Sequence, residues 1–188
     1  MPLPQPTIFH DKWLEAWRTC QRCPLCQTRK QVVLGCGPVP ADVMLVGEAP
    51  GASEDVVAIP FFGRSGRLLH EGIETAKSLM AIDGVNTRYG YPTIFIDNVI
   101  ACRPPDNRDP SGEEAWACWP RLERTYNLVQ PRVVLLVGAT AQKHCRKVWP
   151  NSVNVVHPAW LVRRGGTRAP EYRAFVQRLR EALEGALV

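Results

Sequence analysis

Four short runs of almost uninterrupted apolar residues constrain the fold of this chain more than any other feature. Near-continuous apolar strands of this kind are typical of a parallel sheet that is covered on both faces. The runs alternate with segments of helical character, which favours a three-layer α/β/α fold around a central, mainly parallel four-stranded sheet. The expected strands are residues 42–46, 93–97, 133–137 and 153–156, and the expected helices are residues 11–19, 64–80, 111–129, 139–147 and 170–187.

Two local signals mark where helices begin. Ser111 followed by Glu114 fits a capping box that opens the helix expected at residues 111–129. Pro170 suits the first turn of the last helix, where its missing N–H group costs nothing.

Length and composition indicate one domain with an apolar core. The chain has 188 residues, 45% of them hydrophobic, and shows no repeat or linker, so we expect a single domain over residues 1–188. No run approaches the roughly 18 apolar residues of a membrane span. The N-terminal segment, with Pro2, Pro4 and Pro6, lacks the apolar stretch of a signal peptide. We therefore expect a cytoplasmic monomer. The net charge of +5 permits a nucleic-acid partner without requiring one.

Polar residues follow three of the apolar runs at the points where the predicted strands end. Gly47 and Glu48 follow the first run, Asn98 follows the second and His157 follows the last. Ligands of open α/β sheets bind at the carboxyl ends of the strands, so these residues should face one crevice. An acid, an amide and an imidazole that meet there would suit a polar planar ring.

The cysteines indicate a metal or iron–sulfur site. Seven cysteines in a chain without an export signal are not read as a disulfide framework. Cys20 and Cys23 form a C-x2-C motif that Cys26 continues, and Cys102 and Cys118 flank residues 103–117. Four thiols in two clusters favour a metal over buried free cysteines. Thiolates suit zinc and iron–sulfur clusters alike, and the spacing does not choose between them.

Three extended motifs resemble those of the family 4 uracil-DNA glycosylases, in the same order. They lie at residues 47–69, beginning Gly47-Glu48-Ala49-Pro50-Gly51, at residues 98–108 and at residues 157–163. The resemblance implies an enzyme that hydrolyses the N-glycosidic bond of uracil in DNA. It also implies a [4Fe–4S] cluster held by Cys20, Cys23, Cys102 and Cys118. Cys26, Cys36 and Cys145 fall outside that set and are interpreted as core or surface thiols.

The resemblance gives the pocket residues roles in base recognition. A glycosylase must first take its base out of the stack. Phe61 would then stack on the extruded ring, and Asn98 would pair with the uracil O4 and N3–H and mismatch cytosine. Gly47 and Ala49 would belong to the same substrate site. Without the resemblance, Phe61 reads as a core residue and Asn98 as a turn residue.

The chemistry is the departure of a uracil anion from a sugar that becomes cationic. His157 would donate toward the uracil O2 and stabilise charge where it develops, although a lone histidine is more often structural. Glu48 would position or deprotonate the attacking water. Some related uracil glycosylases carry an aspartate one position later, where this chain has Ala49, so the acid role falls to Glu48 with Glu54 as a second candidate. The alternative is that both acids cap the following helix.

DNA contacts are expected from the loops around the crevice. Leu161 matches the family position that wedges into the gap left by the flipped base. Arg163 and Arg164 follow it directly, and Arg103 and Arg108 lie on the cysteine-bounded loop, where they would contact phosphates. Loop arginines are otherwise usually only solvated.

The chain departs from the family pattern near the crevice, which bears on substrate range and rate. Ala159 stands where the family commonly has serine, and residues 141–156 form a shorter segment than usual. Residues 103–117 contain no histidine, which argues against the covalent trapping of DNA seen in one branch of the superfamily.

Three functional hypotheses remain. The first is a monofunctional uracil-DNA glycosylase of base-excision repair, acting on single- or double-stranded DNA. The others are a glycosylase for another deaminated or modified base and a non-catalytic DNA-binding relative. The joint presence of Glu48, Phe61, Asn98 and His157 favours an enzyme.

Overall fold

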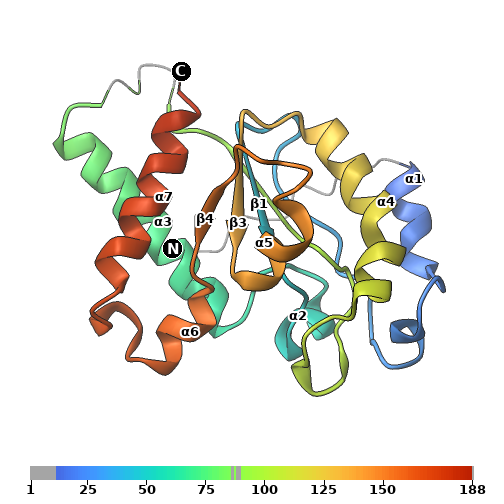
Figure 1. Ribbon diagram of the computed structural model, residues 1–188. Coiled ribbons are helices and arrows are strands. Elements are labelled where there is room, and N and C mark those ends of the chain that lie inside the picture. The colour runs from blue at the N-terminus through green and yellow to red at the C-terminus, as the bar shows by residue number, and fades with distance from the viewer. Residues whose placement is uncertain (1–11, 86, 88–89, 188) are drawn as a thin grey trace.

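The computed structural model describes residues 12–85, 87 and 90–187 (Figure 1). The helix expected at residues 11–19 is a short α-helix, α1 (Lys12–Glu15), continued by a 3-10 turn, η1 (Ala16–Thr19). Residues 1–11, on which the signal-peptide prediction depends, lie outside the described part of the chain. No described helix is both long and apolar enough to cross a membrane.

The four apolar runs form one sheet, as predicted. Its strands are β1 (Val43–Gly47), β2 (Ile94–Asn98), β3 (Val133–Val137) and β4 (Val153–Val155). Their order is β2-β1-β3-β4, and all neighbouring strands are parallel. Gly47 pairs in register with Asn98, which places the ends of β1 and β2 side by side. Every strand therefore ends at the same edge of the sheet.

Helices cover both faces of the sheet, which confirms the three-layer fold (Figure 1). One face carries α3 (Arg64–Ile82), α6 (Pro158–Arg163) and α7 (Tyr172–Gly185). The other carries α4 (Gly112–Val129) and α5 (Ala139–Cys145). The strands alternate accordingly, because Val43 and Leu45 pack toward α3 and α7 whereas Met44 and Val46 pack toward α4 and α5.

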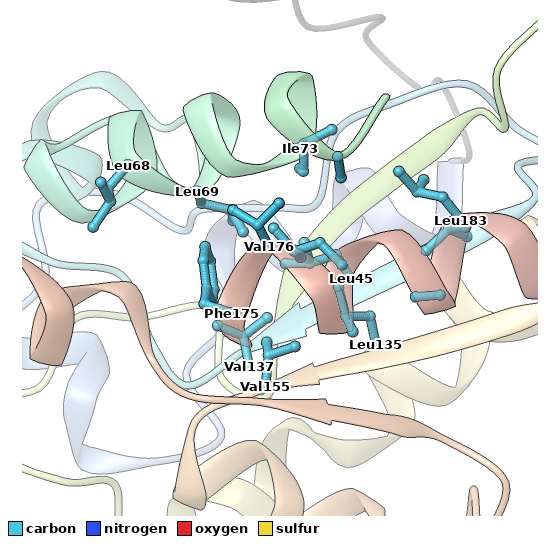
Figure 2. Packing of buried hydrophobic residues seen from close by; sticks show 14 of the residues in the cluster. Leu45, Leu68, Leu69, Ile73, Leu135, Val137, Val155, Phe175, Val176 and Leu183 are labelled. Atoms are coloured by element: carbon cyan, nitrogen blue, oxygen red, sulfur yellow. The ribbon is translucent and has the colours of Figure 1, made fainter. Parts of the chain in front are cut away.

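The core between the sheet and the α3–α7 pair is continuous and apolar (Figure 2). Leu45 and Leu135 of the sheet contact a layer that includes Leu69 of α3 and Phe175 of α7, and none of these side chains is more than 2% exposed. Burial of each such side chain contributes roughly 1.5–3 kcal/mol. This packing holds the strand ends rigidly, which a site built on them requires.

Several helix boundaries differ from the sequence-based expectation. The capping box is confirmed, because the Ser111 side chain accepts from the Glu114 N–H and the Glu114 carboxylate accepts from the Ser111 N–H. The last helix begins at Tyr172, so Pro170 precedes its first turn instead of lying in it. Two short helices, α2 (Ala52–Val57) and α6, were not predicted. Each spans six residues, too few for a clear helical period.

Candidate active site at the carboxyl edge of the sheet

A pocket of about 560 Å³ opens at the carboxyl edge of the sheet. Its wall contains Glu48 from the end of β1, Asn98 from the end of β2 and His157 from the segment after β4. The structure thus brings the acid, the amide and the imidazole together, as predicted. Other wall residues include Ala49, Glu54, Phe61, Arg108, Asp109, Thr140 and Arg163.

Gly47, which is not itself among the residues that line the pocket, allows the lining residues Phe61 and Asn98 to approach each other. A Cβ atom on Gly47 would lie 2.5 Å from both Phe61 Cζ and Asn98 Oδ1, closer than such contacts occur. Phe61 is only 6% exposed and has a left-handed backbone, with φ of 52°, which is uncommon for a bulky residue. Backbone strain of this kind clusters at functional sites. Phe61 belongs both to the core and to the pocket wall.

His157 is held in one tautomer by the start of α6. Its Nδ1 accepts a hydrogen bond from the Ala159 N–H at 3.1 Å, so the proton of the neutral ring lies on Nε2. Burial lowers the pKa of His157, Arg163 lowers it further, and Glu54 opposes both effects. The pocket therefore contains a neutral imidazole with an N–H donor. Its ring lies 6.2 Å from the Phe61 ring at an interplanar angle of 27°.

Glu48 is half-buried and interacts with Thr140 and Asp109, two polar residues that were not predicted from the sequence. Burial raises the pKa of Glu48, a hydrogen bond from the Thr140 side chain opposes the rise, and the charge of Asp109 adds to it. Thr140 follows β3 at the same edge of the sheet, so the strand-end argument applied to β1, β2 and β4 would also have found it. A carboxylate with a raised pKa in a pocket suits a role in proton transfer.

The Glu54 carboxylate accepts a hydrogen bond from the backbone just before α3. The residue is 7% exposed, and its Oε1 accepts from the Gly63 N–H at 2.8 Å, immediately before α3 begins. This contact fits the helix-capping alternative, although Glu54 also lines the pocket.

The four candidate arginines differ in their surroundings. Arg163 is exposed and lines the pocket, as does Arg108, whose guanidinium lies 2.6 Å from the Glu114 carboxylate. Arg164 lies over the Trp160 ring and 2.9 Å from the carboxylate of Glu171, and Arg103 donates to Asn107 Oδ1. Arg163 and Arg108 are thus the two of the four that face the pocket.

The structure places Leu161 in the core, a position that does not fit its predicted role as a wedge. The side chain has no exposed surface and packs in the core together with Leu68 and Phe175. The reason is the unpredicted helix α6, which turns Leu161 inward and leaves Arg163 outside. The position of α6 keeps the Leu161 side chain away from the surface.

The four predicted ligand cysteines influence one another electrostatically. Burial raises the pKa of Cys23, and the charges of Cys118 and Cys20 add to the rise. Burial also raises the pKa of Cys102 to about 12, and Cys118 and Cys23 act in the same direction while Arg29 opposes them. Among the described residues, no three His, Cys, Asp or Glu side chains are arranged to hold a single metal ion.

Two arginines donate to sulfurs of this group. Arg29 Nη1 lies 3.3 Å from Cys102 Sγ, and Arg121 Nε lies 3.5 Å from Cys118 Sγ. Cationic donors favour thiolates, which are the form that binds metals. The donor set therefore has the thiolate chemistry that metal sites use.

The sequence also matches a known protein family, and a pocket at this edge of the sheet is consistent with that match. The family profile described as "Uracil DNA glycosylase superfamily" matches residues 34–180. This chain belongs to that superfamily.

Individual relatives narrow the comparison. The chain is 41% identical over 133 residues to a type-4 uracil-DNA glycosylase of Pyrobaculum aerophilum, covering 71% of this chain and 62% of the relative. It is 38% identical over 127 residues to the type-4 enzyme of Thermotoga maritima, covering 68% and 60%. A type-5 uracil-DNA glycosylase of Pyrobaculum aerophilum is 26% identical over 175 residues, covering 76% and 72%. The matched regions span 51–62% of the type-4 relatives.

Proposed function

We propose that this protein is a monofunctional type-4 uracil-DNA glycosylase that hydrolyses the N-glycosidic bond of uracil in DNA and leaves an abasic site. The observation that carries the proposal is the pocket in which Glu48, Phe61, Asn98 and the neutral His157 meet. The names of the type-4 relatives support the same activity. We also propose that the chain acts as one domain and as a monomer.

Phe61 and Asn98 would recognise the extruded base. The Phe61 ring offers a flat apolar surface on the pocket wall, and stacking on an aromatic ring is one way in which flipped bases are held. The Asn98 side chain offers both a carbonyl acceptor and an amide donor, which match the N3–H and O4 of uracil. Cytosine presents the opposite pattern and would be rejected.

His157 and Glu48 would act on the bond that breaks. The Nε2–H of His157 is a neutral donor that can strengthen its hydrogen bond as negative charge develops on the uracil O2. The Glu48 carboxylate would orient the attacking water and accept its proton, and its negative charge would favour the cationic sugar. Glu54 would act mainly by holding the start of α3.

DNA would approach over the rim of the pocket. Arg163 and Arg108 line the opening and would contact backbone phosphates, with Arg103 and Arg164 farther out. Such contacts are independent of sequence and weaken as salt concentration rises.

Cys20, Cys23, Cys102 and Cys118 would hold a [4Fe–4S] cluster. When bound, the cluster would join the N-terminal segment, the segment after β2 and helix α4 through its bonds to the four thiolates. Arg29 and Arg121 would offset the negative charge on two of those sulfurs.

The direct test uses end-labelled oligonucleotides that carry uracil, hypoxanthine, xanthine or thymine opposite each base, together with the single strands. Incubation with the protein followed by alkaline cleavage reports every base that is excised. We expect cleavage at uracil. Cleavage only at another base would establish a glycosylase of altered specificity, and DNA binding without cleavage would establish a non-catalytic relative.

Thr140 and Asp109 provide a test of Glu48 through pH. If ionised Glu48 is required, activity is lost as the pH falls through its pKa. Thr140→Val removes the hydrogen bond that lowers this pKa, so the acidic limb of the single-turnover rate should move to higher pH. Asp109→Asn removes a charge that raises the pKa and should move the limb to lower pH. Shifts in the same direction, or no shift in either variant, would show that the limb does not report Glu48.

Asn98→Asp tests base reading. An ionised aspartate presents acceptors only and loses the donor to the uracil O4. A bidentate base contact is worth on the order of 1–3 kcal/mol, so uracil excision should fall about 5- to 150-fold. Single-turnover rates on uracil-containing and cytosine-containing strands measure the effect. Unchanged uracil excision in a folded variant would mean that Asn98 only forms the turn after β2.

A further inference from the structure

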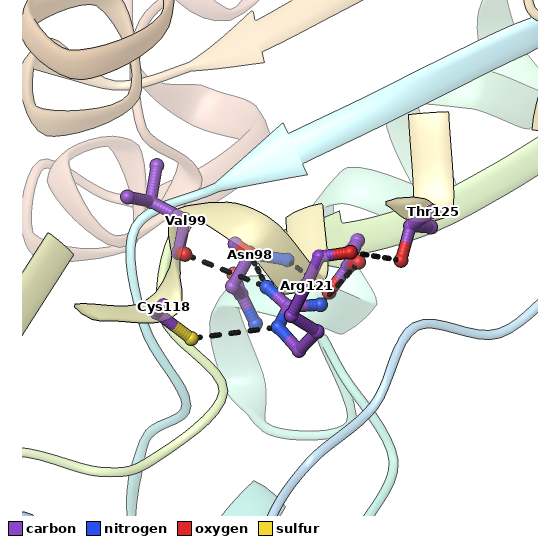
Figure 3. Close-up of polar contacts among 6 residues, drawn as sticks. Asn98, Val99, Cys118, Arg121 and Thr125 are labelled. Atoms are coloured by element: carbon purple, nitrogen blue, oxygen red, sulfur yellow. Dashed lines mark hydrogen bonds and ion pairs between the residues drawn. The ribbon is translucent and has the colours of Figure 1, made fainter. Parts of the chain in front are cut away.

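The interior of the protein contains a fully buried arginine in contact with both the pocket strand and a predicted ligand cysteine (Figure 3). Arg121 of α4 has no exposed surface. Its Nη1 lies 2.6 Å from Asp97 Oδ2, its Nη2 donates to the Asn98 carbonyl at 2.6 Å, and its Nε lies 3.5 Å from Cys118 Sγ. A buried ion pair is weak support for stability, because desolvation offsets most of its attraction. Stability alone therefore does not explain why Arg121 is buried in these contacts.

The Asp97–Arg121 pair holds the backbone of Asn98 from both sides. Asp97 Oδ1 accepts from the Asn98 N–H at 2.7 Å, and Arg121 donates to the Asn98 carbonyl. Arg121 also reaches the Val99 carbonyl at 3.4 Å. These contacts lie at Asn98, the last residue of β2. The next N–H group, that of Val99, donates to the Gly47 carbonyl. The pair thus sets the direction in which the Asn98 side chain leaves the strand.

The Arg121 guanidinium also contacts the predicted metal site, through Cys118. Arginine presents five N–H donors in a rigid planar fork, so a shift of its Nε edge shifts its two Nη groups with it. The Nε edge meets Cys118 one helical turn earlier in α4, and the Nη groups meet Asp97 and Asn98. A lysine at this position could meet the carboxylate but not all three partners together.

We propose that Arg121, held by Asp97, is a positioning residue that fixes Asn98 for base reading and couples this position to the Cys118 sulfur. The inference rests on the proposed function of the pocket. Cys118, held as a ligand, would keep its sulfur in one place, and Arg121 Nε, 3.5 Å from that sulfur, would carry this constraint to the backbone of Asn98. Coupling of this kind is reciprocal, so disturbing Arg121 also disturbs the metal site.

The test compares Arg121→Lys with a matched control, Arg180→Lys. Arg180 of α7 pairs with Asp83 and Glu184, and among the described residues it neither donates to a cysteine nor lines the pocket. Four quantities are measured on each holoprotein: single-turnover release of uracil, affinity for DNA that carries an abasic analogue, amide exchange at residues 98–99, and the rate at which an iron chelator bleaches the visible absorption. Asp97→Asn, which keeps the shape of the side chain, provides a second variant if Arg121→Lys does not fold.

We expect Arg121→Lys to slow uracil release by about 5- to 150-fold, the range of typical coupling free energies. Amide exchange at residues 98–99 and loss of iron should become faster. Affinity for abasic DNA should stay the same, because that DNA offers no base to read. Arg180→Lys should match the wild type throughout, and Asp97→Asn should change in the same direction as Arg121→Lys.

Two outcomes would overturn the inference. One is wild-type uracil release together with wild-type exchange at residues 98–99 in Arg121→Lys. The other is an equal loss of uracil release and abasic-DNA affinity, which would mean a general disturbance of the pocket. Failure of the wild-type protein to release uracil would instead overturn the proposed function, while the exchange and bleaching rates would still decide the coupling.

Discussion

His157→Ala should slow uracil release in single turnover by about a hundred- to a thousandfold while leaving DNA affinity nearly intact. The loss of one donor that acts on developing charge costs about 2.7–4 kcal/mol. The Nε2–H of His157 is in place before the reaction, because Ala159 fixes the ring through Nδ1. The donor strengthens its contact only as the bond breaks, so its removal lowers the rate and spares binding.

His70→Ala is a suitable control for this prediction. His70 lies on α3 outside the pocket wall, and burial lowers its pKa as it does that of His157. Rapid-quench rates and equilibrium binding to uracil DNA would be measured on both variants. Should His157→Ala weaken DNA binding and spare the rate, His157 is not the group that stabilises the departing base.

The sequence predicted the frame of the site because strand ends can be located from apolar runs. The runs before Glu48, Asn98 and His157 proved to be neighbouring or nearby parallel strands, and the polar residues after them share one pocket. Parallel strands that run in one direction must end at one edge, so this part of the site follows from topology alone.

The sequence could not reveal which motif residues are buried. Leu161 occupies a motif position, but position in a motif says nothing of the helix that turns the side chain into the core. Arg121 is a charged residue in an amphipathic helix, where solvent exposure is the ordinary expectation. Arg121 lies on the buried face of α4 together with Cys118, three residues before it, and Thr125, four residues after it. Its buried partner Asp97 comes from a distant strand.

Cys118→Ser should abolish iron binding and, with it, the yield of soluble, folded protein. Cys118 lies on α4 and is the predicted ligand that would tie this helix to the N-terminal segment and to the segment after β2. Structural zinc in zinc-finger peptides binds with about 10–16 kcal/mol, a magnitude comparable to the net stability of about 5–15 kcal/mol of a whole domain. Loss of one ligand should therefore affect folding before it affects chemistry.

Cys26→Ser provides the matched control, because Cys26 is half-buried, lies three residues after Cys23 and is outside the predicted ligand set. The wild type and Cys26→Ser should purify as brown proteins with broad visible absorption and equal iron content, whereas Cys118→Ser should be colourless or insoluble. A folded, colourless wild type with stoichiometric zinc and no iron would refute the cluster. Loss of iron in Cys26→Ser with retention in Cys118→Ser would refute this ligand set, and with it the connection that Arg121 makes between the metal site and the pocket.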